Sequence, residues 1–245
     1  MMLAGRTLLI TGAARGLGRE IARACAAAGA RLVLADIDAG VQSVADDLGA
    51  RGALVDLGDP GSIAALADSI TATEGALHGL CNNGAVATNV GGMGFEDIEL
   101  DLWDRVQRVN VRGTWLMTRA CAPLLRASGS GRVVNVASDT ALWGAPRLLA
   151  YTASKGAVMA MTRSLARELG PDRVGVTCVA PGILTTESTE YVPEARHRLY
   201  HDGRAVPGPQ PASDVTATVA FLLSEGALTL TGQTLPVNNG FVFLT

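Results

Sequence analysis

Residues 7–18 read TLLITGAARGLG, the stretch that decides the fold. The apolar run Leu8–Ile10 predicts a buried strand, and three glycines at the spacing GxxxGxG (Gly12, Gly16 and Gly18) then open a segment with helical periodicity. Missing side chains let the backbone approach a pyrophosphate, and the start of a helix offers free N–H groups and the positive end of its dipole. Strand, glycine turn and helix in this order predict a dinucleotide-binding unit, with an ordinary glycine-rich turn as the alternative.

Short apolar runs alternate with helical patterns along the whole sequence. Strands are expected at residues 7–11, 31–36, 50–56, 77–82, 132–137, 175–180 and 234–237. Helices are expected at residues 16–28, 38–48, 60–73, 98–126, 151–169 and 212–223. Such alternation requires crossover connections, and hence a parallel sheet covered on both faces. The sequence therefore predicts an α/β fold: a Rossmann-type, doubly wound parallel sheet of about seven strands, forming a single catalytic domain over residues 1–245.

Composition excludes several classes of function. The net charge is −3 and no basic stripe is present, so nucleic-acid binding is not expected. The apolar runs are too short to span a membrane, and the first strand follows the N-terminus too closely for a signal peptide. The four cysteines lie far apart without metal-binding spacing. Reduced thiols in a cytoplasmic protein are the simplest interpretation.

Asp36 ends the second expected strand, near the position about 20 residues beyond a glycine turn where an acidic side chain holds a ribose. A carboxylate there accepts hydrogen bonds from both hydroxyls of the adenosine ribose and repels a 2′-phosphate. Asp38 adds negative charge, whereas Arg15 is the contrary feature because it can reach a 2′-phosphate from the glycine turn. The sequence favours NAD over NADP. The alternative role for Asp36, helix capping, suits Asp38 better.

Tyr151 and Lys155 are four residues apart, which places them on one face of a helix. Lys155 is the only lysine in the sequence. A free phenol has a pKa near 10 and is a poor base at neutral pH, but a cation about 4 Å away contributes roughly 4 kcal/mol and lowers that pKa. The pair therefore predicts a proton-transfer site. A surface tyrosine lying over a lysine stem is the alternative.

The sequence resembles the short-chain dehydrogenase/reductases along essentially its whole length. The resemblance is carried by Thr11–Gly18, Asp36, Asp56-Leu57, Asn82-Asn83, Val109–Gly113, Val133–Ser138, Tyr151 with Lys155, Pro181-Gly182 with Thr186, and Thr231–Gln233. Several separated motifs in the family's order are far more specific than any one alone. The resemblance implies an NAD(H)-dependent oxidoreductase that transfers a hydride between nicotinamide and a secondary alcohol or ketone.

The resemblance also implies roles for four catalytic residues. Tyr151 is expected to be the general acid/base, and Lys155 to hold the nicotinamide ribose and lower the tyrosine pKa. Ser138 is expected to hydrogen-bond the reacting oxygen, so that it and Tyr151 form a small polarising site. Asn110 is expected to position a water in a proton relay to Lys155.

Further residues are expected at the cofactor by the same resemblance. Asp56 and Leu57 would flank the adenine, Asn82 would lie beside the adenosine ribose, and Ile183 and Thr186 would contact the nicotinamide carboxamide. The full expected set is Gly12, Arg15, Gly16, Leu17, Gly18, Asp36, Ile37, Asp56, Leu57, Asn82, Asn83, Gly84, Tyr151, Lys155, Pro181, Gly182, Ile183 and Thr186.

Three short segments depart from the family's pattern. Gly84-Ala85 interchanges the usual alanine and glycine, and if position 85 needs a positive φ, alanine there costs about 1 kcal/mol unless Gly84 forms the turn. Thr177 replaces a common asparagine, and Asn238–Gly240 replaces a frequent Asp-Gly-Gly. None of these changes removes a catalytic group.

The substrate side is expected in residues 186–207, which correspond to the mobile lid of the family. The expected substrate-lining residues are Thr140, Trp143, Leu148 and Tyr191. His197 and His201 have a spacing compatible with metal binding, but no suitable third ligand lies nearby, so no metal is expected. The resemblance further implies a homotetramer, with residues 98–126 and 151–169 in one interface.

Two alternative functions stay open. One is a catalytically idle NAD-sensing or regulatory protein on the same fold, because a fold does not determine function. The intact set of Ser138, Tyr151 and Lys155 argues against it. The other is an NADPH-dependent carbonyl reductase, which Arg15 would favour.

Overall fold

The computed structural model describes residues 1–244 and contains one seven-stranded sheet, all of whose strand pairs are parallel. The strands are β1 (Thr7–Thr11), β2 (Arg31–Asp36), β3 (Arg51–Leu54), β4 (Gly79–Asn82), β5 (Arg132–Val136), β6 (Gly175–Pro181) and β7 (Thr234–Val237). Their order in the sheet is β3-β2-β1-β4-β5-β6-β7. The order reverses between β1 and β4, which is where ligands bind in sheets of this kind.

The central strands are buried from end to end. Every residue of β1, β4, β5 and β6 is buried, whereas the edge strands β3 and β7 are half-buried. Apolar runs without alternation are typical of strands covered on both faces, because each side chain meets a packed helix.

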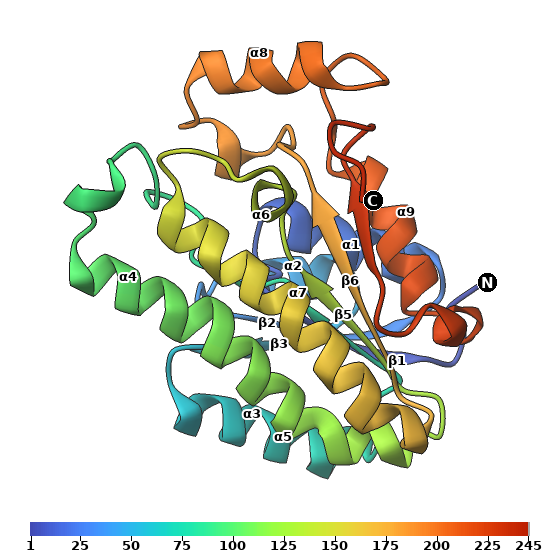
Figure 1. Ribbon diagram of the computed structural model, residues 1–245. Coiled ribbons are helices and arrows are strands. Elements are labelled where there is room, and N and C mark those ends of the chain that lie inside the picture. Colours follow the sequence, from blue (N-terminus) through green and yellow to red (C-terminus); the bar gives the residue numbers. More distant parts are fainter. Residues whose placement is uncertain (245) are drawn as a thin grey trace.

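Helices cover both faces of the sheet (Figure 1). On one face the core joins strand residues to α1 (Gly16–Ala27), α2 (Val41–Asp47) and α9 (Ser213–Leu222). On the other it joins them to α3 (Pro60–Glu74), α5 (Thr114–Ala127) and α7 (Leu149–Leu169), with α4 (Leu100–Gln107) packed beside α7. The expected Rossmann-type, doubly wound parallel sheet is confirmed.

Local signals explain where α3 begins and ends. Asp59 caps its start by accepting a hydrogen bond from the Gly61 N–H at 2.8 Å, and Pro60 occupies the first helical position. Gly75 ends the helix with a φ of +69°, a left-handed conformation that glycine adopts without strain.

The expected continuous helix over residues 98–126 is wrong. The chain forms α4, then a π-helical turn at Arg108–Gly113, then α5. Periodicity alone does not reveal such a turn. The backbone of Gly113 packs so closely that a Cβ there would lie 2.6 Å from the Leu57 carbonyl oxygen. Single π turns of this kind are frequent at functional sites.

Two expected strands are shorter than the sequence indicated. The stretch at 50–56 forms a strand only over Arg51–Leu54, and the one at 77–82 only over Gly79–Asn82. The main-chain N–H of Thr7 donates to His78 Nδ1 at 3.1 Å, so a side chain takes the place of a strand carbonyl there.

Two further helices lie where none was expected. α6 (Thr140–Trp143) follows β5, and α8 (Glu194–Gly203) lies within the segment expected to be a lid. Figure 1 shows α8 apart from both helical layers, above the carboxyl ends of the strands. Among residues 1–244, no helix has the length and apolar character needed to cross a membrane.

Candidate active site

A cavity of about 350 Å³ opens at the carboxyl ends of the strands, around the point where the strand order reverses. Sixteen of the expected site residues line it: Gly12, Arg15, Leu17, Gly18, Asp36, Ile37, Asp56, Leu57, Asn83, Gly84, Ser138, Tyr151, Lys155, Pro181, Gly182 and Thr186. Other expected residues lie outside its lining: Gly16, Asn82, Asn110, Thr140, Trp143, Leu148, Ile183 and Tyr191.

The glycine turn leaves no room for side chains. Gly12 and Gly16 have φ values of +67° and +54°, and a Cβ on Gly18 would overlap the carbonyl oxygen of Gly12. The Asn83 amide braces the turn by donating to the carbonyl oxygens of Thr11 at 3.1 Å and Gly12 at 3.0 Å. No side chain caps the start of α1, so its first N–H groups remain available to an anion. This cradle fits a dinucleotide diphosphate.

Asp36 lies at the end of β2 beside the glycine turn. Its Oδ2 accepts from the Ala14 N–H at 2.9 Å and its Oδ1 from the Asp38 N–H at 3.0 Å. Each oxygen keeps a lone pair, so the fixed carboxylate can also accept hydrogen bonds from ribose hydroxyls. Ile37, with 70% of its surface exposed, and Leu57 line the cavity nearby. Apolar side chains here fit an adenine ring.

Ser138, Tyr151 and Lys155 converge at the other side of the cavity, where β5 and α7 meet. The Lys155 ammonium donates to the Val136 carbonyl oxygen at 2.7 Å and lies 5.5 Å from the centre of the Tyr151 ring. Burial lowers the pKa of Lys155 to about 8, because a low-polarity environment disfavours the charged form. The Ser138 hydroxyl accepts a hydrogen bond from Thr140 Oγ1 at 2.9 Å.

Burial also raises the pKa of the Tyr151 phenol well above its ordinary value. Its contact with Ser138 acts in the opposite direction but is outweighed. This direction is opposite to the expectation that Lys155 lowers the phenol pKa. In the protein alone, Tyr151 is therefore a proton donor rather than a ready base.

Asn110 lies in the π-helical turn and acts on the neighbouring loop. Its Oδ1 accepts from the Val86 N–H at 2.8 Å, and its Nδ2 donates to the Val86 carbonyl at 3.1 Å and to Ser154 Oγ at 3.1 Å. These bonds tie the loop after β4, whose Val86 lines the cavity, to α7. The expected water relay through Asn110 stays a prediction.

Asn82 points into the core instead of the cavity. Its Nδ2 donates to Asn135 Oδ1 at 2.8 Å and to Thr118 Oγ1 at 3.0 Å, and Asn135 in turn donates to Thr162. This buried polar network joins β4, β5, α5 and α7, and sequence reasoning did not identify it. Because buried amides need partners, the network fixes the strand ends that carry the site.

The departures at residues 84 and 85 do not strain the backbone. Neither Gly84 nor Ala85 adopts a positive φ, so the alanine carries no such penalty. A side chain at position 84 would crowd the glycine turn instead, because a Cβ there would lie 3.2 Å from the main-chain nitrogen of Gly12.

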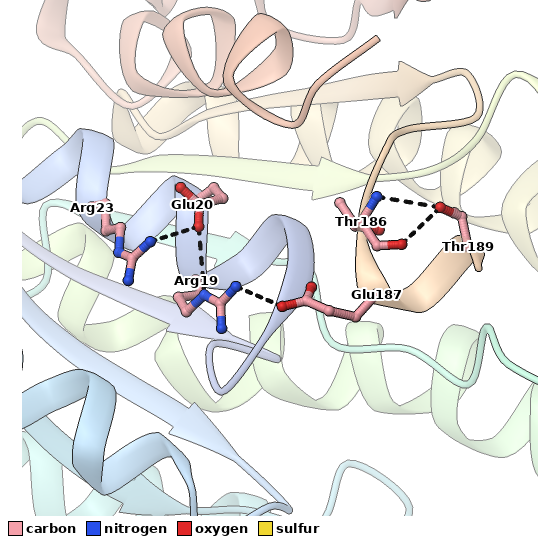
Figure 2. Close-up of polar contacts among 6 residues, drawn as sticks. All are labelled: Arg19, Glu20, Arg23, Thr186, Glu187 and Thr189. Atoms are coloured by element: carbon pink, nitrogen blue, oxygen red, sulfur yellow. Dashed lines mark hydrogen bonds and ion pairs between the residues drawn. The ribbon is translucent and has the colours of Figure 1, made fainter. Parts of the chain in front are cut away.

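The expected lid begins beside the glycine-turn helix. Thr186 caps the short turn Glu187–Thr189, and Glu187 pairs with Arg19 of α1 at 2.7 Å (Figure 2). Figure 2 also shows Arg19 and Arg23 on either side of Glu20. An exposed ion pair of this kind contributes at most about 1 kcal/mol. Thr189 and Arg19 were not expected at the site.

None of the four expected substrate-lining residues lines the cavity itself, but Thr140 and Tyr191 hydrogen-bond residues that do, Ser138 and Ala87. Leu148 packs in an apolar cluster with Tyr151, and the Tyr191 hydroxyl donates to the Ala87 carbonyl oxygen. Trp143 Nε1 donates to the hydroxyl of Tyr200, a residue of the expected lid segment that is buried here.

The two other expected cofactor residues outside the main cavity line neighbouring cavities. Gly16 borders the cavity that contains Arg19 and Glu187, and Ile183 borders one beneath α8. Within residues 1–244, no group of three or more histidine, cysteine, aspartate or glutamate side chains is arranged to hold a metal ion.

Comparison with known proteins agrees with this geometry. The family model described as enoyl-(acyl carrier protein) reductase matches residues 12–242. The chain is 35% identical to a 3-alpha-(or 20-beta)-hydroxysteroid dehydrogenase of Mycobacterium tuberculosis, over 98% of this chain and 90% of the relative. It is 33% identical to a D-threitol dehydrogenase of Mycolicibacterium smegmatis, over 98% of this chain and 94% of the relative.

A solved structure is similar over nearly its full length. This is the 3-ketoacyl-(acyl-carrier-protein) reductase of Brucella melitensis complexed with NADH, with a TM-score of 0.90 and 31% identity. The match covers 98% of this chain and 99% of that one.

Proposed function

Because the chain belongs to the short-chain dehydrogenase/reductase family of oxidoreductases, we propose that it transfers a hydride between NAD(H) and a secondary alcohol or its ketone. The observation that carries the proposal is the convergence of Ser138, Tyr151 and Lys155 on the cavity that also holds the glycine turn and Asp36.

Each group has a distinct task in this proposal. The bound cofactor supplies or accepts the hydride. The Tyr151 phenol gives its proton to the substrate oxygen during reduction and takes it back during oxidation. The Ser138 hydroxyl donates a hydrogen bond to the same oxygen, and the Lys155 ammonium stabilises the phenolate that forms. The glycine turn, with the uncapped start of α1, would hold the diphosphate.

Asp36 supports NAD over NADP. Its carboxylate is held by two main-chain N–H groups at the rim of the cavity, where a 2′-phosphate would be repelled. Arg15 lines the same cavity and favours the second candidate, an NADPH-dependent carbonyl reductase. The names of the relatives, which include two dehydrogenases and a ketoacyl reductase, are compatible with either direction of reaction.

We also propose the homotetramer that the family resemblance implies. The outer surface of α7 supports it, since Leu149 is 45% exposed and a Cβ on Gly156 would meet nothing within 4 Å. A small, apolar surface lets two helices approach closely. Light scattering coupled to gel filtration tests this proposal, and a monomeric mass contradicts it.

The experiment that tests the function is an assay of purified protein with NAD⁺ or NADP⁺ against secondary, cyclic and aryl alcohols, and with NADH or NADPH against the ketones. Turnover with NAD(H) supports the proposal. Equal or better turnover with NADPH favours the carbonyl reductase. Measurable NADH binding without turnover on either panel favours an idle NAD sensor.

A further inference from the structure

Two side chains of α8 contact the body of the protein: Arg196 donates to the Pro146 carbonyl oxygen at 3.0 Å from a partly exposed position, and Tyr200 is buried. Tyr200, only 2% exposed, is the sole buried residue of this polar helix. Its ring stacks on Phe241 with centres 4.1 Å apart, and its hydroxyl accepts a hydrogen bond from Trp143 Nε1 at 3.0 Å. A helix with a single buried side chain depends largely on that side chain for its position, because its other side chains bury little apolar surface.

The hydroxyl of Tyr200 forms a hydrogen bond with the carboxylate of the residue next to the candidate catalytic serine. It donates to Asp139 Oδ1 at 2.6 Å, although 61 residues separate the two. Asp139 directly follows Ser138 and is completely buried. Its second oxygen accepts from Asn238 Nδ2 at 3.1 Å, and its main-chain N–H donates to the Pro181 carbonyl at 2.9 Å.

The same pair touches the wall of the cavity. A Cβ built on Gly182, which lines the cavity, would lie 3.1 Å from both Asp139 Oδ2 and Tyr200 Cε1. The pair therefore packs directly against the backbone at the end of β6. A shift of Tyr200 would change the space beside Ser138 and Gly182 together.

Holding a helix with a buried carboxylate costs free energy, because the charged group leaves water. Among residues 1–244, no ion pair reaches Asp139. The guanidinium of Arg204 lies over the aromatic ring of Tyr200, 5.5 Å from its centre. Burial raises the pKa of Asp139 to about 6, against the hydrogen bonds from Tyr200 and Asn238. The ionised carboxylate offsets this cost by making stronger hydrogen bonds, because hydrogen bonds to an ionised acceptor are roughly twice as strong as neutral ones.

We propose that Tyr200 and Asp139 form a latch of two positioning residues, which holds α8 in place above the carboxyl ends of the strands and fixes the segment that carries Ser138. The catalytic part of this inference rests on the proposed function, whereas the latch itself does not. The latch joins the expected lid to the active-site loop, so that closing the lid and placing Ser138 become one event.

Trypsin tests the latch directly, because α8 contains two cleavage sites, Arg196 and Arg198. Opening of α8 exposes these sites, and the rate of cleavage there follows the population of the open form. Tyr200→Phe keeps the ring and removes the hydroxyl, so we expect cleavage after these arginines, identified by mass spectrometry, to accelerate about tenfold.

Asp139→Ala removes the same hydrogen bond by deleting its acceptor. It should accelerate cleavage to a similar extent, and the double variant should open no faster than either single one, because both remove the same interaction. Asp202→Asn, an exposed carboxylate of the same helix, is the matched control and should leave the rate unchanged. Wild-type cleavage rates in both single variants, or fully additive effects in the double variant, would overturn the latch.

Kinetics then separate positioning from simple attachment. In Tyr200→Phe we expect kcat/KM to fall about tenfold, while the Kd for NADH, measured by fluorescence, stays within about threefold of wild type. Faster cleavage with unchanged kcat/KM would overturn the positioning role. Failure of the proposed function would give a different result. Tyr151→Phe would then keep full turnover, while Tyr200→Phe would still accelerate trypsin cleavage in α8.

Discussion

The ammonium nitrogen of Lys155 lies 5.5 Å from the centre of the Tyr151 ring and 2.7 Å from the carbonyl oxygen of Val136. The helix α7 thus places a buried cation beside a partly buried tyrosine, one turn apart, and the end of β5 holds the cation. Since a nearby positive charge favours the phenolate, this cation can stabilise Tyr151 after the phenol has given its proton to substrate.

The pKa of Lys155 predicts how reduction depends on pH. The buried ammonium has a pKa of about 8 and loses its charge above that value. Without the charge the phenolate formed on Tyr151 is not stabilised, so kcat/KM for ketone reduction should be constant below about pH 8 and decline above it. A pH–rate profile from about pH 6 to 9.5 checks this, and a flat profile would exclude Lys155 as the titrating group.

Asp36→Asn should relax the preference for NAD. The amide keeps an oxygen acceptor for one of the two N–H groups, those of Ala14 and Asp38, and no longer repels a 2′-phosphate. We expect KM for NADP⁺ to fall about tenfold. Asp38→Asn is the control, because its exposed carboxylate only accepts from the Gly40 N–H. Equal effects of the two substitutions would show a general charge effect.

Gly18→Ala should disrupt the glycine turn. The added methyl group would overlap the Gly12 carbonyl and come within 2.5 Å of Asn83 Nδ2. Overpacking of this kind costs about 1–3 kcal/mol, and the displaced turn should abolish measurable NADH binding. Gly170→Ala is the control, because its Cβ would meet nothing within 4 Å. Retained NADH affinity in Gly18→Ala would place the diphosphate elsewhere.

The Asp139 carboxyl predicts a pH dependence of stability. Its pKa is about 6 in the folded protein and ordinarily 3.8, so between these values the folded state binds more protons than the unfolded state. Stability contributed by this group is therefore present at low pH and is lost as pH rises through this window. Tyr200, Asn238 and Arg204 surround the carboxyl and act against this shift without cancelling it.

Asp139→Asn removes the titration and serves as the reference protein. Relative to it, the wild-type free energy of unfolding should fall by about 2 kcal/mol between about pH 4 and pH 7. Chemical denaturation at several pH values measures the difference. A constant difference would show that Asp139 does not titrate in this range.

Much of the fold and the cofactor side could be predicted because their signals are local. The β1 strand, the glycine turn and Asp36 follow one another within about one supersecondary unit. Tyr151 and Lys155 share a helical face, and only four residues separate them. Each of these features is determined by neighbours in the sequence, so a pattern of residue types identifies it.

The remaining features depend on contacts between distant segments. Nothing near Asn82 indicates that its side chain pairs with Asn135, and nothing near Asn110 indicates that Gly113, at the end of its π turn, packs closely against Leu57. The latch joins Asp139 to Tyr200 on a helix too polar for periodicity to identify. Tertiary packing decides such features, and propensity alone does not.

The measurement that tests the central claim most directly is turnover by Tyr151→Phe, with NADH affinity measured on the same preparation. Phenylalanine keeps the ring packed against the cluster of Val90, Val106 and Ala150 and removes the hydroxyl whose proton the reaction transfers. We predict that kcat falls by about 10²- to 10⁴-fold while the Kd for NADH stays within a few-fold of wild type. Unchanged turnover, with NADH still bound, would contradict Tyr151 as the acid/base and with it the proposed mechanism.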